Sequence, residues 1–374
     1  MRRQIDWLAS AGWNVDSLGL GESPTDTVRT HFPLADLPRP ARPRIAKALI
    51  HVFLPYRTRF RVLSESRIPH EVGRRISAGE YDLIIFNDTH LIPWMANKKV
   101  FNASSAKSPF HLDLHEYHPP VLPQNAPWRS LVGGYHKWKR NFIGSPRFAT
   151  RSVVVRAIGE LYESEFDIPQ CTVVRNAPPY VELSPSPVDP NHIQLVHHGA
   201  AAWPRGLAQM AGAMRLLDDR FRLILMLVGN QAIIDEYRLS VSDLGDRVTF
   251  RTPVPMTELP VSINEYDLEI MFFPPTTVNL HFVLPNKLFE AVQGRLGLVI
   301  GPSPMMVEVV EEFGIGVVTE GWEAEDLAAA LNSITGEQIT AMKHAADRAA
   351  KELSAESERN RFFHSLDHAI LTEE

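Results

Sequence analysis

The chain has 374 residues, of which 44% are hydrophobic and 22% charged, and its formal net charge is −6. This length exceeds one ordinary core, so we expect two domains of a globular rather than a disordered or fibrous protein. The acidic balance argues against a general nucleic-acid binder, which needs a net basic face.

The lone cysteine, Cys171, excludes an internal disulfide framework and cannot form a zinc site by itself. No apolar run approaches the roughly 20 residues that cross a bilayer. We therefore expect a cytoplasmic protein that is soluble or at most peripheral at the inner membrane face.

The first segments read as a helix over Arg2–Ala11, a strand over Trp13–Leu18 and a further helix over Ile45–Leu63. Between them, Gly21–Pro43 is polar and bears several prolines, and we assign no regular structure there.

Three short apolar runs that end in polar residues follow, and we read them as strands: Tyr81–His90, Phe110–Tyr117 and Arg151–Glu160. Short buried strands that alternate with helices indicate parallel β-α units, whose ligands gather at the carboxyl ends of the strands. Candidate site residues at such ends are Asn87, Asp88, His115 and Glu116.

Five prolines between Asn176 and Asn191 predict a linker, because proline disfavours helix and central strand. The alternation of strands and helices then restarts and ends with helices over Ala324–Ile334 and about Glu352–Leu371. We predict an α/β protein with two Rossmann-like, doubly wound domains, residues 1–180 and 181–351, with the helix over 352–372 able to pack back on the first.

The stretch HHGAAAWPRGL, residues 197–207, lies between an apolar strand and an apolar helix. Gly199 permits a tight turn, and the amino end of the helix together with Arg205 would favour a diphosphate. Taken alone, such a pattern is more often a plain strand-to-helix turn with a solvated arginine. The GxGxxG pattern of nicotinamide-binding proteins is absent from this stretch.

The stretch LPNKLFEAVQG, residues 284–294, predicts a helix that starts near Pro285 and Asn286. Lys287 then lies in the first turn and Glu290 one turn later on the same face. A bound phosphate would offset the lysine beside the positive helix end, and the carboxylate could accept hydrogen bonds from ribose hydroxyls. An ordinary ion pair between the two is the simpler alternative.

Together these features resemble the GT-B glycosyltransferases, and most closely the retaining family 4 group. The resemblance spans nearly the whole chain. The segments that carry it are NVDSLG, YDLIIFND, LDLHEY, RN before the linker, WPRGL, LMLVG, PNKLFEAVQGRLGLVIG and MMVEVV with FGIGVV.

The resemblance implies that Arg205 and Lys287 contact the donor diphosphate and that Glu290 binds the donor ribose. It also implies that Gly199 lets the phosphates approach. His115, with Asp113 and Glu116 beside it, is similar to a first-domain histidine loop that faces the transferred sugar. Glu308 is better explained as a solvated helix carboxylate.

Three features depart from the pattern. Phe282 stands where family members often have another glutamate, eight positions before Glu290, and Ala200 stands where many have a second arginine. The predicted elements also start with a helix rather than with a central strand. Either the start lies upstream or the first sheet lacks a middle strand, and we favour the former because a missing strand would leave backbone groups unpaired.

The run HKWKRNF, residues 136–142, mixes basic and aromatic residues and could touch anionic lipid or a polymeric acceptor, although such runs are more often exposed helix faces. The histidines show no HExxH or similar spacing, so no metal and no cofactor are expected. No GxSxG motif supports hydrolase chemistry.

We expect a transferase that moves a sugar from a UDP- or GDP-sugar donor to a glycan, lipid-linked or small-molecule acceptor with retention of configuration. A nucleotide-sugar 2-epimerase of the same architecture, or a non-catalytic partner that kept the fold, is the alternative. An epimerase should carry more acid and base side chains around the sugar than the sequence reveals.

Overall fold

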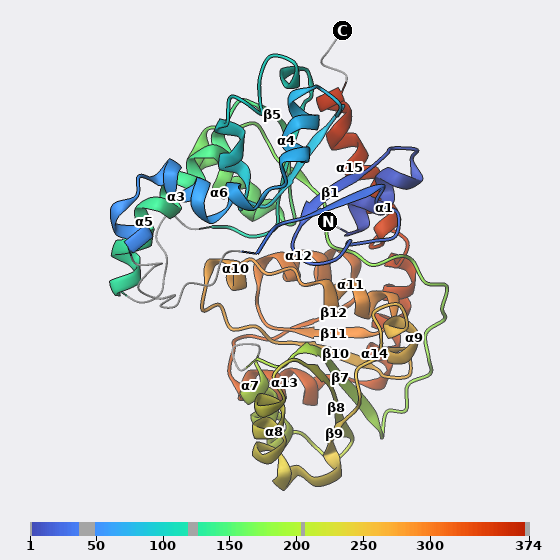
Figure 1. The fold of residues 1–374 in the computed structure, drawn as a ribbon. Coiled ribbons are helices and arrows are strands. Elements are labelled where there is room, and N and C mark those ends of the chain that lie inside the picture. The colour runs from blue at the N-terminus through green and yellow to red at the C-terminus, as the bar shows by residue number, and fades with distance from the viewer. Residues whose placement is uncertain (1, 37–48, 119–125, 203–205, 371–374) are drawn as a thin grey trace. The chain divides into compact units, whose positions relative to one another are not determined.

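The computed structural model describes residues 2–36, 49–118, 126–202 and 206–370, which form two compact α/β units (Figure 1). One unit comprises Met1–Val174 with Arg359–Glu374, and the other comprises Arg175–Glu358. Every strand pairing within the two units is parallel. The predicted fold class, α/β with parallel sheets in two domains, is confirmed.

The second unit is built on a six-stranded sheet in the order β12-β11-β10-β7-β8-β9. Its strands are β7 (Ile193–Ala200), β8 (Phe221–Val228), β9 (Val248–Phe250), β10 (Leu268–Met271), β11 (Gly297–Ile300) and β12 (Gly316–Val318). The chain runs outward from β7 to β9 and then returns to the other side of β7 with β10. The strand order therefore reverses between β7 and β10, which is the place where doubly wound sheets bind ligands.

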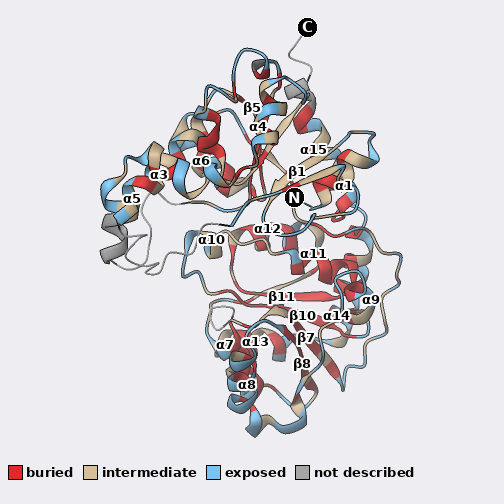
Figure 2. Ribbon diagram, in the orientation of Figure 1, coloured by how far each residue is buried: buried red, intermediate tan, exposed pale blue. Residues whose placement is uncertain are grey.

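Helices cover both faces of this sheet. They are α7 (Leu207–Leu216), α8 (Gln231–Ser240), α9 (Leu259–Ile263), α10 (Val278–His281), α11 (Asn286–Gln293), α12 (Pro304–Phe313), α13 (Ala324–Ser333) and α14 (Gly336–Ala349). Alternate strand residues enter different cores: Leu195 packs with Met210 of α7, whereas Val196 packs with Leu288 of α11. Helix α11 is buried along its length (Figure 2).

Several sequence assignments were wrong. Within the described residues, the single helix predicted over Ile45–Leu63 is interrupted at Leu54 and Pro55, because a new helix starts at Tyr56 after the proline. The run Arg151–Glu160 is not one strand, because β5 (Phe148–Val153) ends inside it and α6 (Arg156–Phe166) begins there. The residue before this helix, Val155, makes no side-chain capping bond, so no local signal marks the start of the helix. Helix α14 was not predicted, although Thr335 and Gln338 form a capping box at its start.

The parallel strands of the first unit fall into two sheets rather than one. The larger has the order β3-β4-β5-β6, and the smaller pairs β1 with β2. Their bounds, with β5 as above, are β1 (Asp16–Gly19), β2 (Thr30–Pro33), β3 (Ile84–Asn87), β4 (Phe110–Leu114) and β6 (Thr172–Val173). Strand β2 lies in the stretch to which we had assigned no regular structure.

The helices of the first unit, besides α6, are α1 (Arg2–Ser10), α3 (Tyr56–Leu63), α4 (His70–Ser77), α5 (Ala126–Arg140) and most of α15 (Ala355–Ile370). Phe362 and Leu366 of α15 pack with Leu8 of α1 and with Val174. The end of the chain is thereby part of the core of the first unit. The predicted domain boundaries, at 180 and 351, remain a proposal beside the structural division at 174 and 358.

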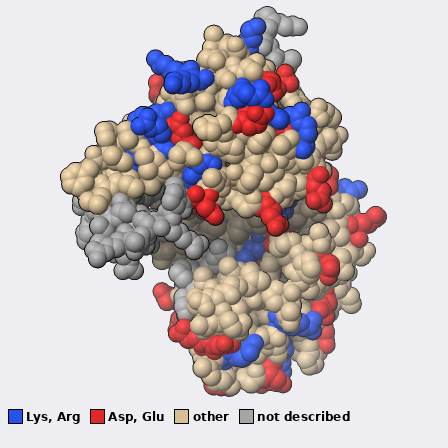
Figure 3. All heavy atoms as spheres, viewed as in Figure 1, with Lys and Arg blue, Asp and Glu red and all other residues tan. Residues whose placement is uncertain are grey.

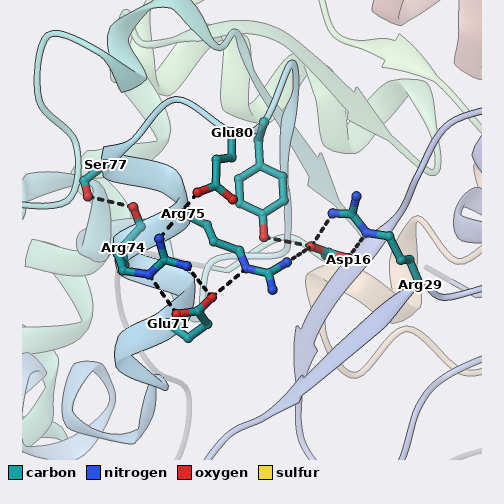
Figure 4. Close-up of polar contacts among 8 residues, drawn as sticks. Asp16, Arg29, Glu71, Arg74, Arg75, Ser77 and Glu80 are labelled. Carbon is teal, nitrogen blue, oxygen red and sulfur yellow. Dashed lines mark hydrogen bonds and ion pairs between the residues drawn. The ribbon is translucent and has the colours of Figure 1, made fainter.

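Asp16 of β1 accepts hydrogen bonds from two arginines and a phenol hydroxyl, which belong to three other segments (Figure 4). It accepts hydrogen bonds at 2.8 and 2.7 Å from Arg29, at 3.2 Å from Arg75 of α4 and at 2.9 Å from the Tyr81 hydroxyl. Burial would raise the pKa of Asp16, but the bonds from Arg29 and Tyr81 hold it below its usual value. This network ties the small sheet to α4 and to the segment that leads into β3.

Candidate functional site

The strongest site candidate in the second unit lies where β7 ends beside β10 and where α11 begins. Leu195 and Val196 of β7 are in register with Leu268 and Glu269 of β10. Pro285 caps α11 without a side-chain hydrogen bond, so the first N–H groups of this helix receive no cap from it. The local sequence therefore places a positive helix end near the switch point of the sheet.

Lys287 lies in the first turn of α11, as predicted, but its side chain is buried at 5% exposure. Its ammonium Nζ donates to the backbone carbonyl of His198 and lies 3.5 Å from Nε2 of His197 and 5.3 Å from the centre of the Phe273 ring. A buried ammonium is costly unless polar groups or an anion compensate it. Lys287 is thus a fixed cation at the end of β7.

Gly199 follows His198 in β7 and has a φ of 113°, a conformation that favours glycine. A Cβ built there would lie 3.3 Å from Nζ of Lys287. Glycine therefore lets the backbone of β7 and the lysine ammonium approach one another closely. A larger residue would strain the backbone and crowd the cation.

Glu290 lies one turn along α11 and is 4% exposed. Its Oε2 is 2.9 Å from Nε2 of His198, whose Nδ1 is 3.0 Å from Oε2 of Glu269. The other oxygen, Oε1 of Glu290, is buried and has no hydrogen-bond partner within the described part of the chain. The sequence placed Lys287 and Glu290 on one face, but it did not reveal the histidine that links Glu290 to the sheet.

Arg205 lies outside the described residues, so its predicted contact with a diphosphate remains a prediction. The next residue, Gly206, has a φ of 75° and is the N-cap of α7. A Cβ at this position would lie 2.1 Å from the carbonyl oxygen of Phe272, so only glycine fits. The start of α7 is consequently held close to the strand that ends at Met271.

The other positions named from the sequence differ in environment. Phe282 is the C-cap of α10, and the centre of its ring lies 4.5 Å from the centre of the His281 ring. Ala200 ends β7 opposite Val228. Glu308 is exposed on α12, as expected for a solvated carboxylate.

In the first unit, His115 follows β4 and contacts a buried carboxylate. Its Nε2 lies 2.9 Å from Oδ2 of Asp113, and its side chain is 30% exposed. The hydrogen bond to Asp113 raises the pKa of His115, against the opposing effect of burial. Asp113 also accepts bonds from Gln4 at 2.7 Å and Ser152 at 2.6 Å, so it is held in place from three sides.

Asn87 and Asp88 end β3, in register with the end of β4. Asp88 has a φ of 62°, and its Oδ1 lies 2.6 Å from Nε2 of His118. Burial would raise the pKa of Asp88, but the bond to His118 holds it below its usual value. The Oδ1 of Asn87 is buried and lacks a hydrogen-bond partner among the residues described. Glu116 is exposed and contributes its backbone carbonyl, which accepts from the Tyr162 hydroxyl at 2.8 Å.

Three site residues were missed from the sequence: His118, His198 and Glu269. His118 lies in HEYHPP, three residues after His115, and this spacing could have drawn attention to it. His198 and Glu269 are 71 positions apart, and nothing local marks them as partners. The one feature of the sequence that pointed to His198 was its place at the end of a predicted strand.

Two absences concern only the described part of the chain. Residues 2–36, 49–118, 126–202 and 206–370 contain no group of three metal-ligating side chains placed to hold an ion. Within the same ranges, no helix is both long and apolar enough to cross a bilayer.

Charged side chains of both signs are interspersed on the face drawn in Figure 3, and most of that face is uncharged. The described residues on this face form no continuous basic field.

Comparison with known proteins gives structural matches only. No protein-family model matches the sequence, and no curated protein matches it either. The chain is similar to a glycosyltransferase from Rickettsia africae, with a TM-score of 0.68 and 10% identity over 100% of this chain and 95% of that one.

Two further solved structures cover nearly the whole chain. HepE from Anabaena, solved in complex with UDP, matches with a TM-score of 0.61 and 17% identity over 95% of this chain and 100% of that one. A UDP-forming α,α-trehalose-phosphate synthase from Burkholderia vietnamiensis matches with a TM-score of 0.61 and 10% identity over 96% and 99%. The protein therefore has the two-domain GT-B fold of solved glycosyltransferases, as the resemblance in sequence implied.

Proposed function

We propose that this protein is a glycosyltransferase that moves a sugar from a nucleoside-diphosphate sugar to an acceptor with retention of configuration, without a metal ion. One observation carries the proposal. A buried cation, Lys287, and a buried carboxylate with an open oxygen, Glu290, lie one turn apart at the start of α11, beside the switch point of the second sheet. The complex of HepE with UDP supports a nucleotide at this kind of fold.

In this proposal the chain acts by electrostatics rather than by a covalent intermediate. The Lys287 ammonium, the first N–H groups of α11 and Arg205 would stabilise the negative charge that grows on the departing diphosphate. Gly199 would let the phosphates approach the backbone of β7. Glu290 would accept hydrogen bonds from the ribose through Oε1.

The first unit would supply the sugar and acceptor side. His115 is held by Asp113 and is partly exposed, so it can donate a hydrogen bond to a sugar hydroxyl. Asn87 and Asp88 end the neighbouring strand, and the open Oδ1 of Asn87 is a ready acceptor. Glu116, which is exposed, is the fourth residue that we assign to this side.

The test is a thermal-shift screen with UDP, GDP and their sugars, followed by a donor-hydrolysis assay. A ligand that binds the native state raises its melting temperature. We expect a shift with at least one diphosphate, a weaker shift for Lys287→Ala, and an unchanged shift for the control Lys351→Ala, which alters an exposed lysine of the same unit. An unchanged shift in Lys287→Ala would contradict the site assignment.

A nucleotide-sugar 2-epimerase is the second candidate. The pairs His115–Asp113 and His118–Asp88 favour it, since they provide two sets of acid and base side chains in the first unit, of which the sequence analysis had missed His118. Proton NMR of a nucleotide sugar incubated without acceptor separates the two. Slow hydrolysis to the free sugar supports the transferase, and conversion to the 2-epimer supports the epimerase. An absence of binding by every nucleotide favours a non-catalytic partner that kept the fold.

We also propose that the first unit meets its acceptor at an anionic membrane surface. Val52, Phe53 and Tyr56 are 54%, 73% and 41% exposed and line an open hollow of about 480 Å³ with Arg59. Tyr56 also packs against Trp138 of the basic end of α5, at 6.3 Å between ring centres. The sequence has no acidic residue between Asp36 and Glu65 or between Glu116 and Glu160, which favours the attraction of anionic headgroups to these two segments.

Sedimentation with vesicles tests the membrane proposal. We expect binding to phosphatidylglycerol vesicles, weak binding to phosphatidylcholine vesicles, and a loss of binding in Phe53→Ser. Equal binding to both lipids, or none to either, would refute it and leave the donor-site proposal untouched.

A further inference from the structure

The buried histidine beside Glu290 has a contact on each ring nitrogen. His198 lies on β7, with Nδ1 at 3.0 Å from Glu269 of β10 and Nε2 at 2.9 Å from Glu290 of α11. The backbone N–H of His198 also donates to Oε1 of Glu269 at 3.4 Å. The three residues are 5%, 0% and 4% exposed, so water contributes little to the solvation of their side chains.

Both ring nitrogens of a histidine can donate only when the ring is protonated. Burial would lower the pKa of His198, but the charge of Glu269 and the hydrogen bonds to Glu269 and Glu290 raise it to about 9. Lys287 on α11 opposes this rise. The charged groups that face the ring are thus Glu269 from β10 and Glu290 and Lys287 from α11, and a carboxylate oxygen at each ring nitrogen favours the imidazolium form.

This arrangement leaves the two oxygens of Glu290 in different states. Oε2 is held by His198, whereas Oε1 is buried and without a partner among the described residues. A buried carboxylate oxygen that lacks a donor is costly, so a group that donates a hydrogen bond to it gains binding energy. A carboxylate free to rotate would lose part of that gain in ordering the side chain.

We infer that His198 is a positioning residue for the ligand: it fixes Glu290 through Oε2 so that Oε1 accepts from the ribose hydroxyls of the nucleotide, and Glu269 in turn fixes His198. This inference rests on the proposed function, because it assigns the ligand of Glu290. Glu269 and His198 need not touch the ligand themselves. In this inference Glu269 orients His198, His198 orients Glu290, and Glu290 binds the ribose.

The test measures how much the ribose hydroxyls contribute to binding. Dissociation constants are compared for UDP and 2′,3′-dideoxy-UDP, and for GDP and its dideoxy form, using whichever base binds more tightly. In the wild type we expect a preference of about 10- to 100-fold for the ribose form, as for hydrogen bonds to a charged group. His198→Gln and Glu269→Gln should reduce this preference to a few-fold, while the affinity for the dideoxy form stays unchanged.

Controls separate positioning from a general effect on the fold. Glu290→Gln should also reduce the preference, whereas His192→Asn, a change at an exposed histidine of the same unit, should leave it intact. A variant with a damaged fold would lose affinity for the ribose form and for the dideoxy form by the same factor. Circular dichroism and the melting temperature report whether each variant is folded.

The wild type alone supplies a second readout that needs no variant. The preference for the ribose form should fade as the pH rises through about 9, where His198 loses a proton. A preference that persists in folded His198→Gln, or is flat with pH in the wild type, overturns the inference while nucleotide binding still supports the proposed function. If neither UDP nor GDP binds the wild type, the proposed function itself fails and the inference falls with it.

Discussion

The two units each pair histidine with carboxylate, but in opposite settings. His198 of the second unit is enclosed by two glutamates at 5% exposure, whereas His115 of the first unit meets one aspartate and has a side chain that is 30% exposed. The enclosed histidine can only hold its neighbours, because a glutamate occupies each of its ring nitrogens. The open histidine can still exchange a proton or a hydrogen bond with a sugar.

The largest expected difference between them is in stability. His198→Ala removes the shared partner of two buried carboxylates and should lower the free energy of unfolding by about 3–5 kcal/mol, as for a broken buried ion pair. His115→Ala should cost only about 1 kcal/mol, because Gln4 and Ser152 still donate to Asp113. Urea denaturation of both variants measures this. Equal losses of unfolding free energy in the two variants would contradict the difference between the enclosed and the open histidine.

The second-largest difference between the two sites is expected in how their contribution to stability depends on pH. The pKa of His198 is raised to about 9 from an unfolded value of about 6.5, so its contribution is complete below about pH 6.5 and disappears as the pH rises through 9. The full contribution is about 3 kcal/mol, at 1.36 kcal/mol for each unit of pKa shift.

For this measurement, the difference in unfolding free energy between wild type and His198→Gln is followed from about pH 6 to about pH 9.5, where we expect it to shrink. The same difference for His115→Gln has the same sign, because the pKa of His115 is also raised. A difference that grows with pH for His198 would mean that the ring is buried neutral.

The third prediction concerns turnover. His115→Gln should lower kcat by about 100-fold if this residue assists the transfer as a proton donor or acceptor. The nucleotide affinity should not change, because His115 belongs to the first unit and the nucleotide is assigned to the second. Steady-state kinetics with the donor sugar identified in the thermal-shift screen provides the measurement. A rise in KM without a fall in kcat would instead assign His115 to binding.

The smallest effect is expected at an exposed ion pair of the first unit. Arg74→Ala removes the contact of Arg74 with Glu71 at 2.6 Å, in which the two side chains are 63% and 41% exposed. Such pairs contribute little because solvent screens them. The midpoint of urea unfolding should stay at the wild-type value, which makes this variant a matched reference for the two histidine variants.

Much of the candidate site was accessible from the sequence because its signals are local. Pro285 and Asn286 mark the start of α11, and the spacing of Lys287 and Glu290 places them on one helical face. The strand ends at Asp88, His115 and Gly199 are also local, since each apolar run stops there. The α/β class followed from the alternation of such runs.

The sequence by itself determined the class of fold and the place of α11, because helix starts and apolar periodicity depend on residues a few positions apart. Only the tertiary structure decided that His198 lies between Glu269 and Glu290, which are 71 and 92 positions away from it in the chain. Partners at such separation are chosen by strand order and register, and these depend on the packing of the whole unit. The charge of a buried histidine depends on those partners, so it too could be known only from the folded protein.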